Sequence, residues 1–311
     1  MRVSTRSYDI TLGSPVTISI MYSYNPSRWY VLKIYAKKFL HWNKNSSPFL
    51  SVDSFADFCD INVTPPRFRG RTPSRKKIKQ AKSIFCDSDK LQGFLDKYHQ
   101  DINAKVIVSG NTDFEFHRKL INLPTTVKRC YLQNSFITDD ERYRTIPIGI
   151  ENFRYGMNGN PKFMKKVQPF QSRKNKILLG PFSPTHEERS RVLESIHSTS
   201  FIDVRLERIE PNILAKVFQE YKFVAAVRGN GVDTHRIWES LYRGCVPIVQ
   251  ESDWSKFLVI LNLPIQFINN WDTSELEDCV DRKTDAEFDP LKIAPLWMEY
   301  WQNLILMDLA D

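Results

Sequence analysis

The sequence predicts an α/β protein of two domains, each built on a parallel sheet that faces a central cleft. Short apolar runs of the kind that form buried parallel strands recur through both halves of the 311-residue chain. In the second half these runs alternate with helical segments, which is typical of a sheet covered by helices on both faces. The length is sufficient for two domains of ordinary size, each with its own core.

The composition is that of a folded globular protein, because 41% of the residues are hydrophobic and 13% are aromatic. The chain has no stretch of about 18 apolar residues, so we expect no membrane span. The N-terminus lacks the basic, apolar and small-residue order of a signal peptide. We therefore expect a cytoplasmic protein, either free or peripheral at the inner face of a membrane.

The cysteines indicate reduced thiols. There are five of them, they lie far apart, and no two form a C-x-x-C pair. An odd number without close pairing fits buried thiols in a cytoplasmic protein better than a disulfide framework or a zinc site. They are Cys59, Cys86, Cys130, Cys245 and Cys279.

The chain is basic, with a net charge of +8 and a pI of about 9.1, so we expect anionic partners such as phosphorylated substrates, anionic lipid or nucleic acid. Part of the excess lies in one cluster, which fits a solvated loop and helix start equally well. A nucleic-acid-binding protein that uses this cluster is an alternative function, but no helix-turn-helix, zinc-finger or RNA-recognition pattern accompanies it. The cluster comprises Arg67, Arg69, Arg71, Arg75, Lys76, Lys77 and Lys79.

The first half is expected to form an N-terminal domain over residues 1–152, with strands and helices in mixed order. A proline-rich basic loop spans Thr64–Ser74. Residues 153–176 are rich in Asn, Gly, Pro, Lys and Arg and are expected to form an interdomain linker. The expected helices are Trp29–Leu40, Ile78–Phe85 and Leu91–Tyr98, and the expected strands are Thr17–Tyr22, Lys105–Ser109, Val127–Leu132 and Thr145–Ile150.

The second half, residues 177–311, is expected to form a C-terminal domain of regular strand–helix units. Thr185 and Glu188 have the spacing of a capping box, and another helix is expected to end at Gly244. The amphipathic segment Pro290–Leu309 is expected to pack on its own domain or, alternatively, to dock onto the N-terminal domain or a membrane surface. The other expected elements are the strands Ile177–Leu179, Phe201–Leu206, Phe223–Val227, Val246–Val249 and Ile265–Ile268, and the helices Thr185–His197, Pro211–Tyr221 and Thr273–Val280.

One strand–loop–helix–strand unit, Val227–Val249, carries the clearest functional signal. Gly229 and Gly231 allow the backbone to turn sharply and to approach a ligand closely. Asp233 or Thr234 can cap the helix that follows. The free N–H groups and the dipole at the start of this helix favour an anion such as a phosphate.

A second loop is expected beside it, because ligands of parallel sheets bind outside the carboxyl ends of the strands. This rule brings Gly180–Thr185 and Arg228–His235 to one edge of the sheet, facing the cleft. His186 and Arg189 follow the first of these loops and are candidate phosphate or sugar ligands, as is Thr185. Helix capping is the alternative role for Thr185.

The residues Gly231–Val249 read G-x-D-T-H-R-x-W-E-x-L-x-x-G-x-x-P-I-V and resemble the donor-binding motif of exostosin-like glycosyltransferases. More loosely, the unit resembles that of fucosyltransferases, and Ser109–Asp113 and Ile146–Glu151 resemble segments of such bacterial proteins. The resemblance implies a GT-B fold, in which two Rossmann-like domains face a central cleft. The N-terminal domain would bind the acceptor and the C-terminal domain the nucleotide sugar, and no metal or other cofactor is expected.

The resemblance implies a glycosyltransferase that moves a sugar from a nucleotide-diphosphate donor to a glycan or glycolipid acceptor, in surface polysaccharide biosynthesis. Glu239 would bind the donor ribose, since a carboxylate accepts two hydrogen bonds from a cis-diol. Arginines and helix N–H groups would neutralise the diphosphate as it leaves. The candidate donor-binding residues are Arg228, Gly229, Asn230, Gly231, Asp233, Thr234, His235, Arg236, Glu239, Thr185, His186 and Arg189.

These residues also have structural interpretations. His235, Glu239 and Arg243 share one helix face and could form only a surface ion-pair ladder. Arg228 and Arg236 could be solvent-facing charges, and His235 could merely cap and pack. A non-catalytic scaffold with a glycosyltransferase-like fold is a further alternative. The core positions of the same helix are expected to be Ile237, Trp238 and Leu241.

An inverting transferase needs a base in the N-terminal domain to take the acceptor hydroxyl proton. Asp113 is the first candidate for this catalytic role, because it follows a buried strand and a glycine turn; a helix N-cap is its alternative role. Asp139, Asp140 and Glu151 are weaker candidates, and a retaining enzyme would need no such base. The triplet Asp87-Ser88-Asp89 has the D-x-D form of metal-dependent transferases, but such matches are common by chance and no nucleotide-binding first strand precedes it.

Overall fold

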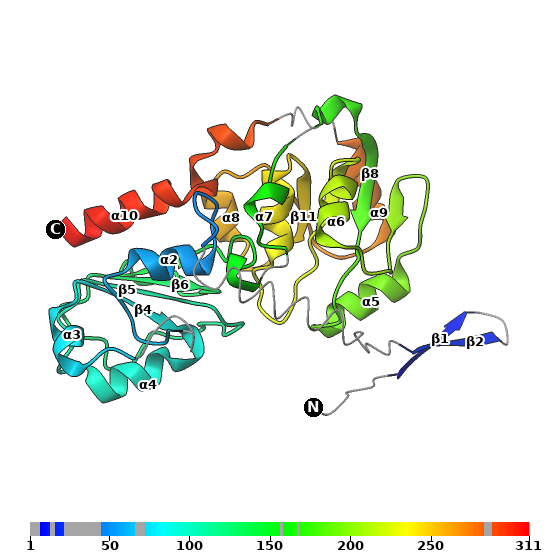
Figure 1. Cartoon of the computed structure of the whole chain (residues 1–311). Coiled ribbons are helices and arrows are strands. Elements are labelled where there is room, and N and C mark those ends of the chain that lie inside the picture. The colour runs from blue at the N-terminus through cyan, green and yellow to red at the C-terminus, as the bar shows by residue number, and fades with distance from the viewer. Residues whose placement is uncertain are drawn as a thin grey trace.

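The computed structural model of the chain describes residues 7–12, 16–21, 45–65, 72–155, 158–166, 168–282 and 288–310. Two five-stranded sheets organise this part of the chain, and every strand pair within them is parallel (Figure 1). A separate antiparallel hairpin pairs β1 (Ser7–Leu12) with β2 (Val16–Met21). The predicted α/β class is confirmed, and the two parallel sheets are compatible with two Rossmann-like units.

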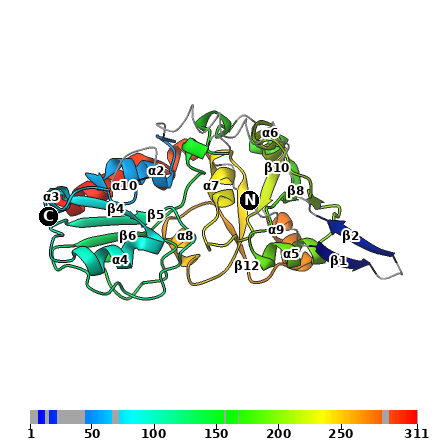
Figure 2. The same ribbon diagram turned by 60° about the horizontal axis from the view of Figure 1, so that its bottom comes forward.

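The N-terminal sheet has the strand order β3-β4-β5-β6-β7. Successive side chains of its strands enter different cores, since Ile84 and Ile107 pack with α4 while Phe85 and Val108 pack with α2. Helices therefore cover both faces of the sheet (Figure 2). The elements are α2 (Val52–Phe58), β3 (Ile61–Asn62), α3 (Arg75–Gln80), β4 (Ser83–Asp87), α4 (Ser88–Tyr98), β5 (Val106–Gly110), β6 (Arg129–Gln133) and β7 (Tyr143–Ile146).

The C-terminal sheet has the strand order β12-β11-β10-β8-β9. From β8 the chain adds β9 on one side and then returns to place β10 on the other side. The carboxyl ends of β8 and β10 therefore flank a topological switch point, where open α/β sheets bind ligands. The elements are β8 (Lys174–Leu179), α5 (Glu187–Ser195), β9 (Ile202–Val204), α6 (Pro211–Phe218), β10 (Tyr221–Ala225), α7 (His235–Tyr242), β11 (Val246–Gln250), α8 (Lys256–Ile260), β12 (Gln266–Ile268) and α9 (Thr273–Asp281).

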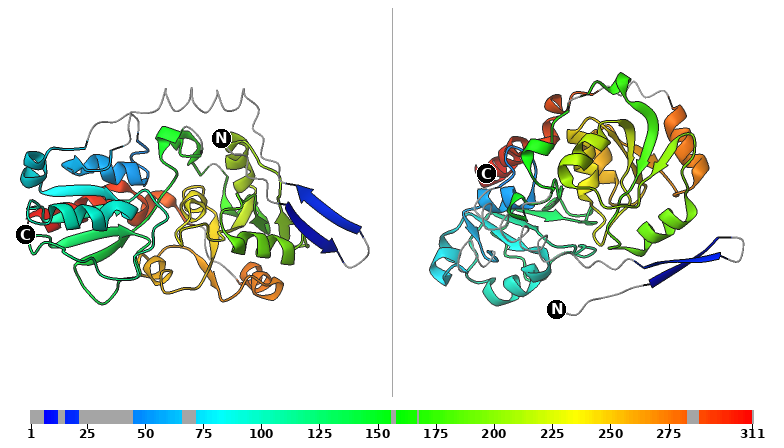
Figure 3. Two further views of the ribbon diagram at one scale, coloured as in Figure 1. Left: turned by 90° about the horizontal axis from the view of Figure 1, so that it is seen from below. Right: turned by 45° about the vertical axis from the view of Figure 1, so that its right-hand side comes forward.

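The end of the chain returns to the N-terminal sheet. Helix α10 (Met298–Ala310) lies along α2 and β5, as Figures 2 and 3 show. Asp308 fixes its end, because its carboxylate accepts hydrogen bonds from Tyr131 Oη at 2.5 Å and from Arg129 Nε at 3.3 Å. Among the described residues, no helix is long and apolar enough to cross a membrane.

Short 3₁₀ turns connect the two sheets and precede α10. The segment expected to be a linker packs on α7, since Phe163 O accepts a hydrogen bond from Arg243 and Met164 is buried. The turns are η1 (Phe153–Tyr155), η2 (Pro161–Phe163), η3 (Phe170–Ser172), η4 (Pro290–Lys292) and η5 (Ala294–Leu296).

Some element predictions were wrong in type or bounds. Residues Ile78–Phe85 are not one helix, because α3 ends at Gln80 and β4 begins at Ser83. A short buried strand and a buried helical turn have the same apolar content, and here pairing with β3 and β5 decides the outcome. The last helix starts at Met298 rather than Pro290. The predicted helix Trp29–Leu40 and the cluster residues Arg67, Arg69 and Arg71 lie outside the described residues.

Candidate functional site

The loops that follow β8 and β10 meet at the switch point of the C-terminal sheet. Gly229 sits where they touch, because a Cβ atom there would lie 3.2 Å from Arg189 Nη2 and 3.3 Å from Thr185 Oγ1. Gly231 is equally confined, since its Cβ would lie 2.8 Å from Asn134 Nδ2 of the N-terminal half. The glycines therefore allow three segments to converge on one point.

Arg189 joins the two loops. Its Nε donates to Arg228 O at 3.0 Å, and its Nη1 donates to Ser183 O and Thr185 Oγ1, both at 3.0 Å. A longer contact of 3.5 Å leads from Nη2 to Thr234 Oγ1 at the start of α7. The side chain thus holds both loops and the helix start in one arrangement.

Arg236 contacts the loop that follows β8. Its Nη1 and Nη2 donate to Gly180 O at 3.2 Å and to Pro181 O at 2.8 Å. Its guanidinium also lies 5.4 Å from the ring centre of Phe182 and 5.0 Å from that of Phe218. Arg189 lies over Phe182 as well, so two cations share one aromatic ring.

Neither guanidinium group forms an ion pair within the described part of the chain, where Arg189 and Arg236 donate only to carbonyl and hydroxyl oxygens. Burial lowers the pKa of Arg236 to about 10, opposed by the charge of Glu239. Burial and the charge of Arg236 lower the pKa of Arg189 to about 10, opposed by the charges of Asp113 and Glu188. Both cations are disfavoured by their surroundings despite these carboxylates, so a bound anion would stabilise this corner.

Helix α7 begins beside these cations. Thr234, rather than Asp233, is its N-cap, and its hydroxyl accepts from Arg236 N. Asp233 is buried and already engaged, since its carboxylate accepts from Ile148 N at 2.7 Å and from Trp238 Nε1 at 2.9 Å. Burial raises the pKa of Asp233 to about 7 despite these hydrogen bonds.

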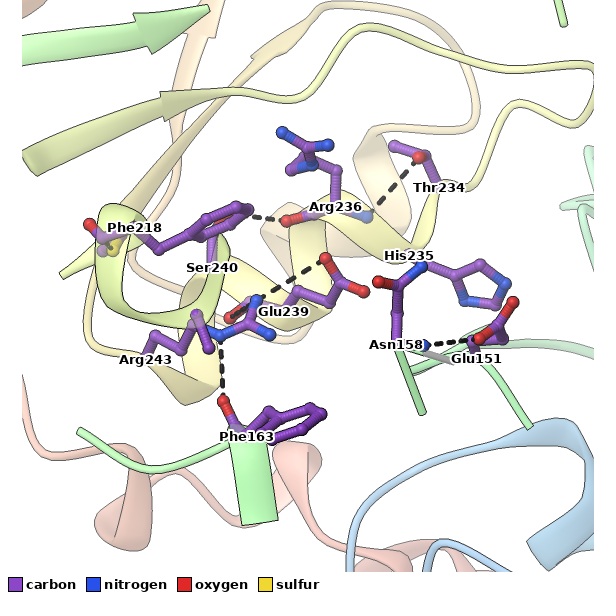
Figure 4. Close-up of polar contacts among 12 residues, drawn as sticks. Glu151, Asn158, Phe163, Phe218, Thr234, His235, Arg236, Glu239, Ser240 and Arg243 are labelled. Carbon is purple, nitrogen blue, oxygen red and sulfur yellow. Dashed lines mark hydrogen bonds and ion pairs between the residues drawn. The ribbon is translucent and has the colours of Figure 1, made fainter. Parts of the chain in front are cut away.

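Glu239 lies one turn further along α7, inside the protein (Figure 4). Its carboxylate forms an ion pair of 3.5 Å with Arg243, and the two side chains are only 6% and 2% exposed. The surface-ladder interpretation is therefore wrong for this pair. Arg243 Nε donates to Phe163 O at 3.0 Å, and this hydrogen bond fixes the guanidinium group that pairs with Glu239.

His235 at the start of α7 and Glu151 of the N-terminal half lie beside this stretch of the helix. His235 Nδ1 lies 2.7 Å from Gly149 O; because a carbonyl only accepts, Nδ1 is the donor. Glu151 lies beside the His235 ring and accepts from Asn158 N at 2.7 Å (Figure 4). Burial raises the pKa of Glu151, opposed by the charge of His235 and supported by that of Glu239. Sequence reasoning ranked Glu151 low and missed Asn158.

The loop after β5 lies across from the glycine loop. Asp113 is exposed, and its carboxylate accepts from Asn230 Nδ2 at 3.3 Å. Glu115 pairs with Arg228 Nη2 at 2.7 Å, so Arg228 is not a solvent-facing charge. No helix begins at Asp113 in the described chain, which excludes the N-cap interpretation. The candidate base and the candidate donor loop are therefore neighbours.

The start of α5 differs from the predicted capping box. His186 is the N-cap, since its Nδ1 accepts from Glu188 N at 3.2 Å. Thr185 instead accepts from Arg189, and the Glu188 carboxylate accepts from Trp271 Nε1 at 2.9 Å. The capping box therefore does not form, because Arg189 engages Thr185 and the distant Trp271 engages Glu188.

The weaker candidates have other partners. Asp139 pairs with Lys119 at 3.0 Å, and hydrogen bonds from Arg142 lower the pKa of Asp140 to about 2. Asp87 pairs with Lys90 at 2.9 Å and is the last residue of β4, whereas the sequence predicts a helix up to Phe85. No group of three His, Cys, Asp or Glu residues within the described ranges could hold a metal ion.

The cysteines are buried, and two described residues of the basic cluster form ion pairs. All five thiols are free and buried, and burial raises the pKa of each, to about 11 for Cys245 and Cys279. In the cluster, Arg75 and Lys79 both pair with Asp101, at 3.0 and 3.1 Å, which reduces the charge open to a nucleic acid.

The fold and the site together define an α/β protein with two Rossmann-like parallel sheets and a cationic corner at the switch point of the second sheet. No protein-family model matches the chain, and no curated protein matches it either.

Proposed function

We propose that the protein is a GT-B glycosyltransferase that transfers a sugar from a nucleotide-diphosphate donor to a glycan or glycolipid acceptor. The observation that carries this proposal is the pair of guanidinium groups of Arg189 and Arg236, which form no ion pair in the described chain and lie at the N-terminus of α7. A diphosphate would balance both charges and would accept hydrogen bonds from the backbone of the glycine loop.

These cations would act mainly during bond cleavage. When the sugar leaves, the terminal phosphate oxygen gains negative charge, and fixed positive charges in a partly buried corner stabilise that charge. Because Arg189 and Arg236 are already held by loop carbonyls, little reorganisation would be needed as the reaction proceeds. This arrangement supports transfer without a bound divalent metal.

Glu239 would bind the ribose of the donor. It lies one turn beyond the anion corner on α7, where its carboxylate pairs with Arg243. An ionised carboxylate accepts hydrogen bonds from two neighbouring hydroxyls.

Asp113 would act as the base on the opposite side. The acceptor hydroxyl gives its proton to Asp113, and its oxygen forms a bond to the anomeric carbon. The bond from that carbon to the phosphate oxygen breaks, and the nucleoside diphosphate leaves with the electron pair. The contact of Asp113 with Asn230 supports this position. The basic net charge would suit an acceptor presented at an anionic membrane surface, as in surface polysaccharide biosynthesis.

Thermal unfolding of the full chain with UDP, GDP, CMP, dTDP or inorganic pyrophosphate tests the proposal. A ligand present at about 100 times its dissociation constant stabilises the native state by about 2.7 kcal/mol. We expect pyrophosphate and one of the nucleoside diphosphates to raise the melting temperature. If none of these compounds does so, the proposed function is wrong.

The variant Arg189→Gln removes one charge and keeps a hydrogen-bond donor for the loop carbonyls. Pyrophosphate affinity, measured by calorimetry below the melting temperature, should fall about 10- to 100-fold. Arg191→Gln is the matched control, because Arg191 lies on the same helix and pairs with Glu187 at the surface. Equal losses in the two variants would contradict a specific role for Arg189.

A further inference from the structure

The loop after β5, residues 111–117, has features that the donor site does not use; we refer to it as the β5 loop. It belongs to the N-terminal half and meets the donor loop through two contacts, Asp113 with Asn230 at 3.3 Å and Glu115 with Arg228 at 2.7 Å. A ligand of the β5 loop would therefore lie beside the cationic corner formed by Arg189 and Arg236.

Phe114 is a large apolar side chain at the tip of this loop, and 48% of it is exposed. Its ring meets the edge of the Phe116 ring at a centroid distance of 4.9 Å and an interplanar angle of 71°. Phe116 is buried and anchored, since its N donates to Asn134 O at 3.0 Å and its O accepts from Phe136 N at 2.9 Å. Phe114 is thus an exposed aromatic ring on a firmly held support.

Carboxylates lie on both sides of this ring in the sequence. Asp113 is exposed, and Glu115 is partly exposed beside Arg228. Ionised carboxylates only accept hydrogen bonds, so they suit hydroxyl donors and repel anions. An aromatic face beside acceptor oxygens matches a sugar ring, which has one face of C–H groups and a rim of hydroxyls.

We propose that the β5 loop is the acceptor-binding site and that it takes a neutral, hydroxyl-rich sugar whose apolar face packs on Phe114. This inference rests on the proposed transferase function, because that function supplies the need for an acceptor beside the donor. Stacking on Phe114 holds the sugar with a hydroxyl toward Asp113. Glu115 is paired with Arg228, but Asp113 is exposed and forms no ion pair among the described residues, so its carboxylate disfavours a uronic acid or another anionic sugar beside it.

Saturation-transfer-difference NMR on the full chain tests this site without requiring turnover. The probes are the methyl glycosides of glucose, galactose and mannose and, as the anionic comparison, methyl glucuronide, each with and without pyrophosphate. We expect saturation of a neutral glycoside, strongest on the C–H groups of one ring face, and little saturation of the glucuronide.

Variants identify the surface involved. Phe114→Ala should weaken the signal of the neutral glycoside by about fivefold or more, and Phe114→Tyr should retain it. Ile121→Ala is the matched control, since Ile121 is 68% exposed on the same connection but its backbone is tied to Gln92 of α4. It should leave the signal unchanged.

Equal signals from the wild type and Phe114→Ala, no signal from any neutral glycoside, or a stronger signal from the glucuronide would each overturn the acceptor site. These outcomes are separate from the proposed function, which depends on the binding of pyrophosphate and nucleotide. If sugar binds at Phe114 but no phosphate compound binds, the site stands as a sugar-binding surface and the donor assignment fails.

Discussion

Glu239 combines two roles that a single substitution does not separate easily. Its carboxylate is the ion-pair partner of the buried Arg243, so truncation would leave that guanidinium unpaired inside the protein. Removing one partner of a buried pair typically costs about 3–5 kcal/mol. Loss of ligand binding in Glu239→Ala could then reflect local unfolding rather than a lost contact.

Glu239→Gln is therefore the informative change. The amide also removes the ion pair, but it keeps the size of the side chain and one acceptor oxygen toward Arg243, and it offers a single acceptor where a cis-diol needs two. We expect affinity for the stabilising nucleotide to fall about 10- to 100-fold, and affinity for pyrophosphate, which has no ribose, to stay within about twofold. Calorimetry with both ligands measures the two effects. Equal losses for both would rule out a ribose contact.

Asp113→Asn tests the base at the same scale. The amide can still accept the hydrogen bond of Asn230 but cannot take up a proton. Turnover should fall about 10²- to 10⁴-fold, with nucleotide affinity nearly unchanged. Steady-state rates and calorimetry on one preparation provide the comparison. Full activity in this variant would eliminate Asp113 as the base.

The termination of α7 gives a prediction at the level of the element. Gly244 has φ of +71°, and a Cβ atom there would lie 2.9 Å from the side chain of Lys166. Gly244→Ala should lower the free energy of unfolding by about 1–2 kcal/mol. Gly93→Ala in α4 is the opposite case, because a Cβ there meets nothing within 4 Å, and it should raise stability by about 0.5–1 kcal/mol. Urea denaturation that shows the same sign for both variants would contradict this explanation.

Elements governed by local signals could be predicted from the sequence. Gly244 as the end of α7, Pro211 at the start of α6 and the helix α9 depend on residues within one or two turns. By contrast, β4 is fixed by its neighbours in the sheet, which lie outside its own segment. The N-cap of α5 differs from the capping box because Arg189 takes the hydroxyl of Thr185 and the distant Trp271 takes the carboxylate of Glu188.

The candidate site also has one part that could be predicted from the sequence and one part that could not. The glycine loop, Thr234 and Glu239 could be recognised because they lie within one unit of about 20 residues. The ion pair of Arg228 with Glu115 and the proximity of Glu151 to His235 could not, since each joins residues that are more than 80 positions apart. No periodicity in the sequence reports on such pairs.

At the scale of the whole molecule, the polar contacts that join the two halves near the site involve the strand–loop–helix–strand unit Val227–Val249. Asp233 accepts from Ile148 N, Asn134 Oδ1 accepts from Asp233 N at 3.1 Å, and His235 bonds to Gly149 O. The loop that would bind the donor therefore also sets the position of the N-terminal half. Substitutions in this loop are expected to affect stability as well as binding.

Asp233 makes this junction sensitive to pH. Burial raises its pKa from 3.8 to about 7, so the folded protein holds the proton more tightly than the unfolded chain, and ionisation opposes folding. Its contribution to stability is largest below about pH 4 and declines as the pH rises through about 7.

Asp233→Asn cannot ionise; relative to it, the wild type should lose about 2–3 kcal/mol in free energy of unfolding between about pH 5 and pH 8. Urea denaturation across this range measures the difference, with Asp253→Asn as the control, since Asp253 is exposed and Lys256 lowers its pKa. A wild-type curve parallel to that of Asp233→Asn would mean that this carboxylate is ionised throughout and that the junction does not titrate.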